Sequence, residues 1–280
     1  MNAIEIKNLT KEYPGFRLGP MDLVLPSGCI LGLVGENGAG KSTTIKLILD
    51  MIRRDSGSIM VLGRDNQVDL HLTKEELGVV LDDVGIPDCL DTVKVGKVMA
   101  GIYRSWDQRL YEHYLDKLSI PHGKLFKDLS RGNKMKLGIA IALSHGAKLL
   151  ILDEATSGLD PVVRDEVVTL FHEFTRDPGH SVLISSHIVS DLEKLCDYIA
   201  FLHQGKLLLY EEKDALMGHY CIVHGTAQQL AGIDPTAVIG RKINAYGGEM
   251  LVKRSAVPAD METSPITVEE LFLFMIKEAK

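Results

Sequence analysis

Residues 35–43 read Gly-Glu-Asn-Gly-Ala-Gly-Lys-Ser-Thr and lie between two apolar runs, 31–34 and 45–49. The first run, Leu-Gly-Leu-Val, predicts a buried strand, and the second, Ile-Lys-Leu-Ile-Leu, predicts a helix. Glycines let successive backbone N–H groups turn inward around an anion, and the helix presents its positive end to the same point. A strand, a glycine-rich turn and a helix in this order predict a phosphate loop, so we expect the chain to bind a nucleoside triphosphate.

The side chains of this loop have separate expected roles. Lys41 can reach the β- and γ-phosphates, and the Ser42 hydroxyl can ligate Mg²⁺. The residues of the loop expected to bind the nucleotide are Gly35, Asn37, Gly38, Ala39, Gly40, Lys41, Ser42 and Thr43.

The composition is that of a globular protein with room for one large domain and an appendage. The chain has 280 residues, 45% of them hydrophobic, and its net charge of −7 disfavours a general affinity for nucleic acid backbones. Its four cysteines show no CxxC spacing and are expected to be reduced, intracellular thiols. The start lacks the apolar core of a signal peptide, and no stretch reaches the roughly 18 apolar residues of a membrane span. A membrane role would therefore require a partner.

Strand and helix patterns alternate along the chain. Strands are expected at 4–9, 21–25, 57–63, 77–81, 149–152 and 182–184, with a hairpin at 199–202 and 206–209. Helical periodicity dominates 92–146, and a helix over 162–174 follows Asp160 as cap and Pro161 at the first helical position. This alternation predicts an α/β fold with a largely parallel core sheet and a helical insertion.

The strand at 149–152 is followed by two adjacent carboxylates, Asp153 and Glu154. In a phosphate-loop fold this strand lies beside the one that feeds the loop. Asp153 would then hold the Mg²⁺ shell, and Glu154 would polarise an attacking water. Taken alone, the pair is equally consistent with a strand that ends in a solvated turn.

Three further segments accompany these carboxylates: Leu-Ser-Arg-Gly-Asn at 129–133, Ser-Gly-Leu-Asp at 157–160, and Ser-Ser-His at 185–187. In this order and spacing they resemble the signature motif, the D-loop and the switch histidine of ABC-type ATPases. The resemblance covers residues 4 to about 213 and points, more weakly, to the ATPases of bacterial peptide, drug and modulin exporters.

The resemblance implies a RecA-like parallel core with an antiparallel β subdomain, a helical subdomain at about 88–146, and an ATP-binding domain spanning 1–213. It also implies ATP and Mg²⁺ as cofactors and a head-to-tail pair of subunits, most simply a homodimer. ATP would lie between the phosphate loop of one copy and Ser130 and Gly132 of the other. The remaining expected roles are catalysis by Glu154 and His187, adenine stacking on Tyr13, metal binding by Ser42, Asp153 and Asp82, and communication across the interface by Asp160.

Two departures from the family pattern concern charged side chains. Asp82 occupies the position where the family usually carries a glutamine, and an aspartate there is shorter and charged, although it can still approach the metal through water. Arg131 stands within the signature where a glycine is common, which is expected to place a charge near the phosphates of the second copy.

Residues 214–280 form a small C-terminal region beyond the resemblance. Thr267 and Glu270 have the spacing of a capping box, and the apolar run 271–276 follows them. A helix that is apolar on every face must be buried on more than one side. Packing within its own subunit and contact with a second copy are both open.

The favoured function is the ATP-hydrolysing subunit of a bacterial membrane exporter for peptides, drugs or lipids. It would be cytoplasmic, bound to an integral membrane permease at the inner face of the cell membrane, with no nucleic acid partner. The alternatives are a soluble ABC ATPase that acts on ribosomes or nucleic acid, and a regulatory module without turnover. The intact set of Lys41, Asp153, Glu154 and His187 argues against the regulatory module.

Overall fold

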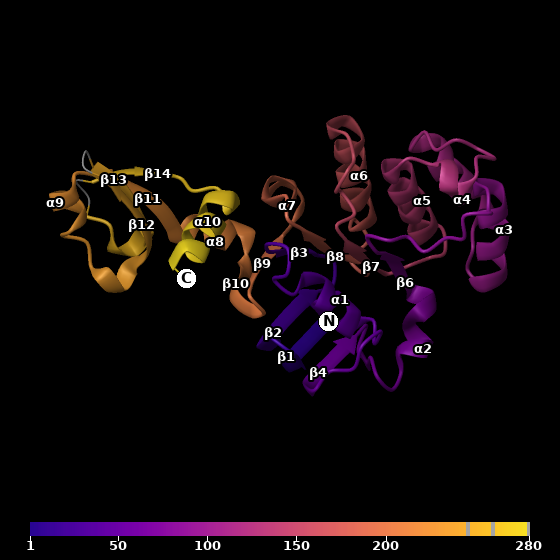
Figure 1. Cartoon of the computed structure of the whole chain (residues 1–280), viewed down its shortest axis with the longest axis horizontal. Helices are drawn as coiled ribbons and strands as arrows, with labels where there is room; N and C mark the ends of the chain where they lie inside the picture. Colours follow the sequence, from indigo (N-terminus) through magenta and orange to yellow (C-terminus); the bar gives the residue numbers. More distant parts are fainter. Residues whose placement is uncertain (245–246, 259–260, 279–280) are drawn as a thin grey trace.

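The computed structural model describes residues 1–244, 247–258 and 261–278 of the chain. Its centre is a six-stranded sheet in the order β10-β9-β3-β8-β7-β6 (Figure 1). The strands are β3 (Ile30–Val34), β6 (Leu77–Val80), β7 (Leu149–Asp153), β8 (Ser181–Ser186), β9 (Tyr198–His203) and β10 (Lys206–Glu212). Five of them run parallel, and β10 returns antiparallel to β9 as the predicted hairpin. The predicted α/β core is confirmed.

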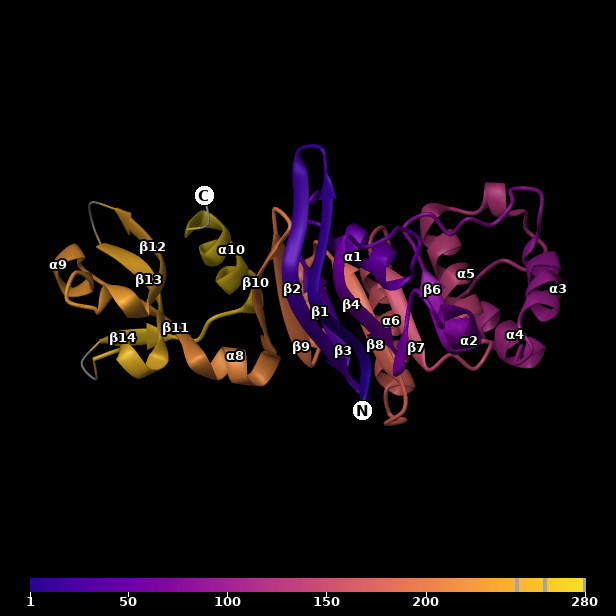
Figure 2. The same ribbon diagram turned by 90° about the horizontal axis from the view of Figure 1, so that it is seen from below.

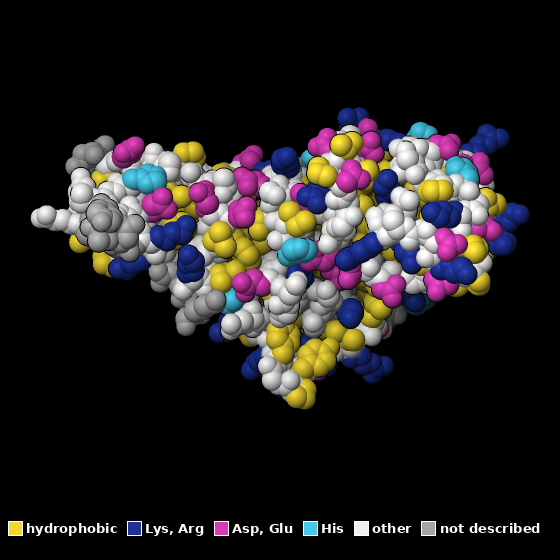
Figure 3. All heavy atoms as spheres, turned by 45° about the horizontal axis from the view of Figure 1, so that its top comes forward, with side chains coloured by type: hydrophobic (Ala, Val, Ile, Leu, Met, Phe, Trp, Pro, Cys, Tyr) yellow, Lys and Arg dark blue, Asp and Glu magenta, His cyan; other side chains and the backbone are white. Residues whose placement is uncertain are grey.

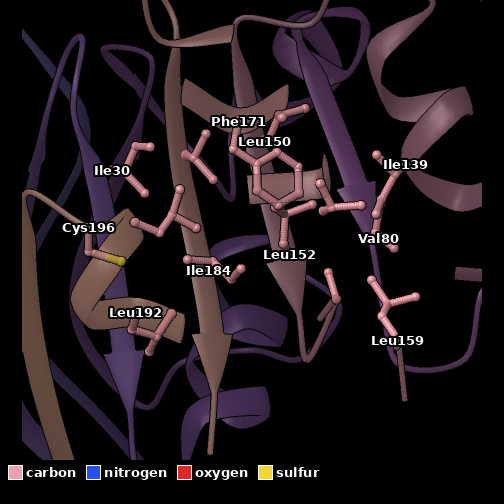
Figure 4. Close-up of a cluster of buried hydrophobic side chains, with 14 of the residues drawn as sticks. Ile30, Val80, Ile139, Leu150, Leu152, Leu159, Phe171, Ile184, Leu192 and Cys196 are labelled. Carbon is pink, nitrogen blue, oxygen red and sulfur yellow. The ribbon is translucent and has the colours of Figure 1, made fainter. Parts of the chain in front are cut away.

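The central sheet is buried on both faces because its strands carry apolar residues at nearly every position. Alternate side chains point to opposite faces. Leu150, Leu152 and Ile184 pack with Phe171 and Leu192, as Figure 4 shows. Their strand neighbours face a second cluster on the other side of the sheet, which includes Leu31, Leu33, Leu149, Ile151 and Leu183. The first face is covered by helices that include α5 (Arg131–Leu143), α6 (Pro161–Phe174) and α7 (Val189–Leu195).

The second face of the central sheet is covered by α1 (Lys41–Ile48) and by an antiparallel sheet in the order β2-β1-β4-β5. The strands of this sheet are β1 (Asn2–Tyr13), β2 (Phe16–Pro26), β4 (Ser56–Val61) and β5 (Arg64–Asp65). A short helix, α2 (Leu70–Thr73), follows it. This sheet is the predicted antiparallel subdomain.

The helical insertion lies between β6 and β7 and comprises α3 (Thr92–Ile102), α4 (Gln108–Lys117) and α5. Each helix begins at a side-chain cap that its sequence supplies, namely Asp91, Asp107 and Ser130. The insertion and the C-terminal region lie at opposite ends of the long axis of the molecule (Figure 2).

The C-terminal region is built on a separate antiparallel sheet in the order β12-β13-β11-β14. Its elements are α8 (Lys213–His219), β11 (Tyr220–Gly225), α9 (Ala227–Leu230), β12 (Val238–Asn244), β13 (Gly247–Lys253), β14 (Glu262–Ser264) and α10 (Val268–Glu278). It has its own small core, which includes Cys221, Val223, Met250 and Val252. Within the described residues, no helix is long and apolar enough to cross a lipid bilayer.

Helix α10 begins with the predicted capping box. The backbone N–H of Glu270 donates to the Thr267 hydroxyl at 3.2 Å, and the Glu270 carboxylate accepts from the Thr267 backbone N–H at 2.9 Å. Phe272 is 6% exposed and meets Phe201 of β9 edge to face, with ring centroids 5.1 Å apart. Phe274 lies against Gly240 of β12. The helix therefore packs within its own subunit, between the central sheet and the C-terminal sheet.

This packing predicts that Phe272→Ala lowers the free energy of unfolding by about 3 kcal/mol, because it leaves a cavity against Phe201. Leu273→Ala is the matched control, since Leu273 is 45% exposed and should cost less than about 1 kcal/mol. Urea unfolding followed by far-ultraviolet circular dichroism measures both variants. Equal losses would contradict the packing described for α10.

Candidate active site

The carboxyl ends of the parallel strands meet at one edge of the central sheet. Val34 pairs with Ser186, and Asp153 pairs with Ser185, so the segments that follow β3, β7 and β8 begin at the same level. A cavity of about 750 Å³ opens at this edge. Its lining consists of Phe16, Glu36, Asn37, Gly38, Gly40, Lys41, Ser42, Thr43, Asp82, Arg131, Glu154, Ser157 and His187. Open parallel sheets bind ligands at this edge.

The loop at 35–40 is shaped by its glycines. Gly40 has φ of +112° and is the N-cap of α1, and a Cβ at this position would lie 2.8 Å from Cδ1 of Leu18. A Cβ at Gly35 would lie 2.6 Å from the carbonyl oxygen of Leu202. Only glycine fits these two positions. Because neither residue has a side chain, the loop can pack closely against the β9–β10 hairpin, and α1 can begin at the cavity. The first turn of α1 thus directs its backbone N–H groups into the cavity.

Lys41 is a buried cation at the base of the cavity, with only 5% of its surface exposed. Its Nζ donates to the carbonyl oxygen of Gly35 at 2.7 Å and lies 3.2 Å from Oε1 of Glu154. A buried ammonium group requires such partners. The ammonium group is thus held beside the loop whose N–H groups would receive phosphates.

Glu154 connects the loop after β7 to the rest of the site. Its backbone has φ of +55°, which is uncommon for a residue other than glycine, and its N–H donates to the carbonyl oxygen of Ser185 at 3.1 Å. One carboxylate oxygen faces Lys41, and the other accepts a hydrogen bond from Nδ1 of His187 at 2.7 Å. The carboxylate is fixed from both sides, as a group that orients a water molecule needs to be.

Asp153 is also buried, with 5% exposure, and accepts a hydrogen bond from the hydroxyl of Ser185. Among the described residues, no group of three or more histidine, cysteine or acidic side chains is arranged to hold a metal ion. A divalent cation here would therefore depend on phosphate oxygens together with the oxygens of Ser42 and Asp153. Such an all-oxygen set suits Mg²⁺.

Ser130 and Gly132 lie at the start of α5 and outside the lining of their own cavity. The hydroxyl of Ser130 accepts from the backbone N–H of Asn133 at 3.2 Å, which caps the helix. Asp160 caps α6 in the same way at 3.1 Å, as its sequence predicts. A role for Ser130 and Gly132 at a second copy stays a prediction.

Tyr13 ends β1, is 41% exposed, and lies outside the cavity lining. Its partner in the β1–β2 hairpin is Phe16, and that ring does line the cavity. Ala39 is buried beneath the loop, where its carbonyl oxygen accepts from the backbone N–H of Gly205 at 3.0 Å. Adenine stacking on Tyr13 stays a prediction, and Phe16 is an aromatic residue at the site that the sequence reasoning missed.

Arg131 is expected near the phosphates of a second copy, and that stays a prediction. Its guanidinium lines the cavity of its own chain, and Nη2 lies 2.7 Å from Oδ1 of Asp82. The two residues stand 49 positions apart, so no local pattern predicts this contact. The two charged departures from the family pattern, Asp82 and Arg131, form an ion pair with each other.

Comparisons with known proteins agree with this geometry. The ABC transporter family model matches residues 18–157. The chain is 36% identical over 219 residues to the lantibiotic transport ATP-binding protein SrtF of Streptococcus pyogenes, covering 75% of this chain and 91% of SrtF. It is 32% identical over 211 residues to the bacitracin transport ATP-binding protein BcrA of Enterococcus faecalis, covering 74% of this chain and 68% of BcrA.

The fold is similar to that of the ATP-binding cassette MJ0796, solved as a dimer in a post-hydrolysis state with ADP and Pi bound. The TM-score is 0.67 at 19% identity, and the match covers 75% of this chain and 98% of that one. Together with the family match and the sequence identities, the fold leads to one conclusion: the chain belongs to the ABC transporter family, as an ATP-binding subunit.

Proposed function

We propose that this chain powers a bacterial membrane exporter as a head-to-tail homodimer, bound to an integral membrane permease at the cytoplasmic face of the cell membrane. The observation that carries the proposal is the position of the Glu154 carboxylate between Lys41 and His187. This arrangement joins a phosphate-binding cation, a base and a histidine at one cavity, as ATP hydrolysis requires.

The roles of the site residues follow from their positions. Lys41 exchanges its contact with Glu154 for the β- and γ-phosphates, which releases one oxygen of that carboxylate. Glu154 then orients the attacking water, while His187 holds the other oxygen and faces the γ-phosphate. When bound, Mg²⁺ neutralises charge on the phosphates, and Ser42 and Asp153 are the residues that would hold it, with Asp82 acting through water. The loop from Gly35 to Thr43 binds the remaining phosphate oxygens.

A second copy would complete the site. The N-terminus of α5, with Ser130 and Gly132, offers a hydroxyl and backbone N–H groups that its own cavity does not use. In a head-to-tail dimer, these donors would face the γ-phosphate of the nucleotide held by the partner. They would therefore contact it only when the two copies come together around the nucleotide. The similar fold of MJ0796, solved as a dimer with ADP and Pi, supports a dimer of this chain.

The transported substrate is proposed to be a peptide, drug or lipid, since SrtF is named for lantibiotic transport and BcrA for bacitracin transport. Action on ribosomes or nucleic acid is disfavoured by the net charge of −7. Basic side chains are interspersed with acidic ones across the face drawn in Figure 3. We divide the chain into an ATP-binding domain at 1–213 and an accessory region at 214–280.

Lys41→Ala is expected to weaken ATP binding by at least tenfold, because it removes a charge that contacts the phosphates before the reaction. Equilibrium titration with a fluorescent ATP analogue measures the affinity. Lys46→Ala is the matched control, because Lys46 lies on the same helix and is exposed. Unchanged affinity in Lys41→Ala would contradict the phosphate-binding role of the loop.

Glu154→Gln is expected to retain ATP binding and lose about 10²- to 10⁴-fold in turnover, because an amide cannot act as a base. It should also accumulate as an ATP-bound dimer, visible by size-exclusion chromatography. Glu166→Gln, an exposed position on α6, serves as control. Turnover of Glu154→Gln within a few-fold of wild type would show that another group orients the water.

Ser130→Arg is expected to abolish hydrolysis while leaving the first binding of ATP intact, since the residue serves the nucleotide of the partner. Mixing the Ser130→Arg chain with the Lys41→Ala chain creates heterodimers. In each heterodimer one nucleotide site has neither defect, and the other site has both. Each homodimer should be inactive, and the mixture should recover part of the activity. A Ser130→Arg homodimer with normal turnover would contradict the head-to-tail arrangement.

A further inference from the structure

Arg131 connects three loops of its own chain at the edge of the nucleotide cavity. It begins α5, and its Nη2 lies 2.7 Å from Oδ1 of Asp82, just after β6. Its side-chain stem runs beside Gly158, where an added Cβ would lie 3.6 Å from Cδ of Arg131. Arg131 also lines the same cavity as Lys41 and Ser42.

The charges around the cavity indicate what the Arg131 side chain can contribute to nucleotide binding. The lining contains two permanent cations, Lys41 and Arg131, and three carboxylates, Glu36, Asp82 and Glu154. Each cation is paired with a carboxylate, Lys41 with Glu154 and Arg131 with Asp82. A triphosphate entering the cavity is repelled by the carboxylates, and each of the two cations offsets part of that repulsion.

The Asp82–Arg131 pair is easily exchanged. Its side chains are 58% and 63% exposed, and exposed ion pairs stabilise a fold only slightly. A guanidinium can instead donate two parallel hydrogen bonds to one phosphate group, which carries more charge than a carboxylate. Phosphate oxygens are thus the better partner once a nucleotide is present.

We propose that Arg131 binds in cis the phosphates of the nucleotide held by its own chain, and that Asp82 holds the guanidinium in place until the nucleotide arrives. Arg131 is then a second phosphate-binding cation beside Lys41. Asp82 competes with the phosphates for the guanidinium of Arg131. The proposal needs ATP binding at this cavity, and it does not require the second copy.

The test is equilibrium titration of the full-length chain with a fluorescent ATP analogue in EDTA, at concentrations where light scattering shows a monomer. Arg131→Gln should raise the Kd on the order of tenfold, as expected for loss of a charge-assisted hydrogen bond. Arg131→Lys should recover part of the loss, because it keeps the charge without the bidentate geometry. Asp82→Asn should bind more tightly than wild type in EDTA, where Asp82 has no metal to hold, because the substitution releases the guanidinium.

Lys117→Gln is the matched control. Lys117 forms an exposed ion pair with Glu173 at 3.1 Å, between α4 and α6 and outside the cavity lining. The Kd of Lys117→Gln for the ATP analogue should stay within about twofold of the wild-type value, because the variant loses only the long-range field of one charge. Thermal unfolding of every variant, compared with wild type, reports whether the fold is retained.

An unchanged Kd for Arg131→Gln in the monomer would overturn the proposal, and so would a tenfold weaker Kd for Asp82→Asn. Loss of hydrolysis in Arg131→Gln with unchanged binding by the monomer would assign the residue to the partner's nucleotide instead. If Arg131→Gln folds poorly, the test uses Arg131→Lys instead. A Kd of Arg131→Lys equal to that of wild type would contradict bidentate binding of the phosphates. Lys41→Ala in the same titration reports on the phosphate loop independently of Arg131.

Discussion

The site depends on a single carboxylate held between two nitrogen groups at the edge of a parallel sheet. Glu154 lies one residue beyond β7, and its backbone is fixed by the neighbouring strand through Ser185. Its side chain lies between Lys41, from the loop after β3, and His187, from the loop after β8. Three separate segments of the chain therefore meet because their strands are parallel and in register. A slip of one strand by one residue would turn these side chains to the wrong face of the sheet.

The same sheet links the site to the C-terminal region. Phe201 of β9 packs against Phe272 of α10. One residue further along β9, the carbonyl oxygen of Leu202 lies so close to Gly35 that no side chain fits between them. The backbone N–H of Gly205, in the turn after β9, donates to Ala39 in the phosphate loop. Packing of α10 thus supports the strand and turn on which the phosphate loop rests.

Features that depend on neighbouring residues could be predicted from the sequence. The phosphate loop, the Asp160 cap and the Thr267–Glu270 capping box are local patterns, and each forms as its residues dictate. The parallel core followed from alternating strand and helix patterns together with fully apolar strands. The family resemblance supplied the expected roles of His187 and Ser130, which no local pattern defines.

Features that depend on distant residues could not be predicted. The contact between Asp82 and Arg131 joins two loops whose separation only the folded chain determines. Tyr13 and Phe16 are paired aromatic residues of one hairpin, and only the folded chain shows that Phe16 lines the cavity and Tyr13 does not. The strands of the C-terminal sheet were not predicted, because polar residues and glycines interrupt their apolar pattern.

The most direct measurement is a crystal structure of the chain with Mg²⁺ and a non-hydrolysable ATP analogue. The account predicts that Lys41 leaves Glu154 and contacts the phosphates, while the contact between Glu154 and His187 persists around a water molecule or the γ-phosphate. A structure in which the analogue binds and Lys41 still pairs with Glu154 would contradict it.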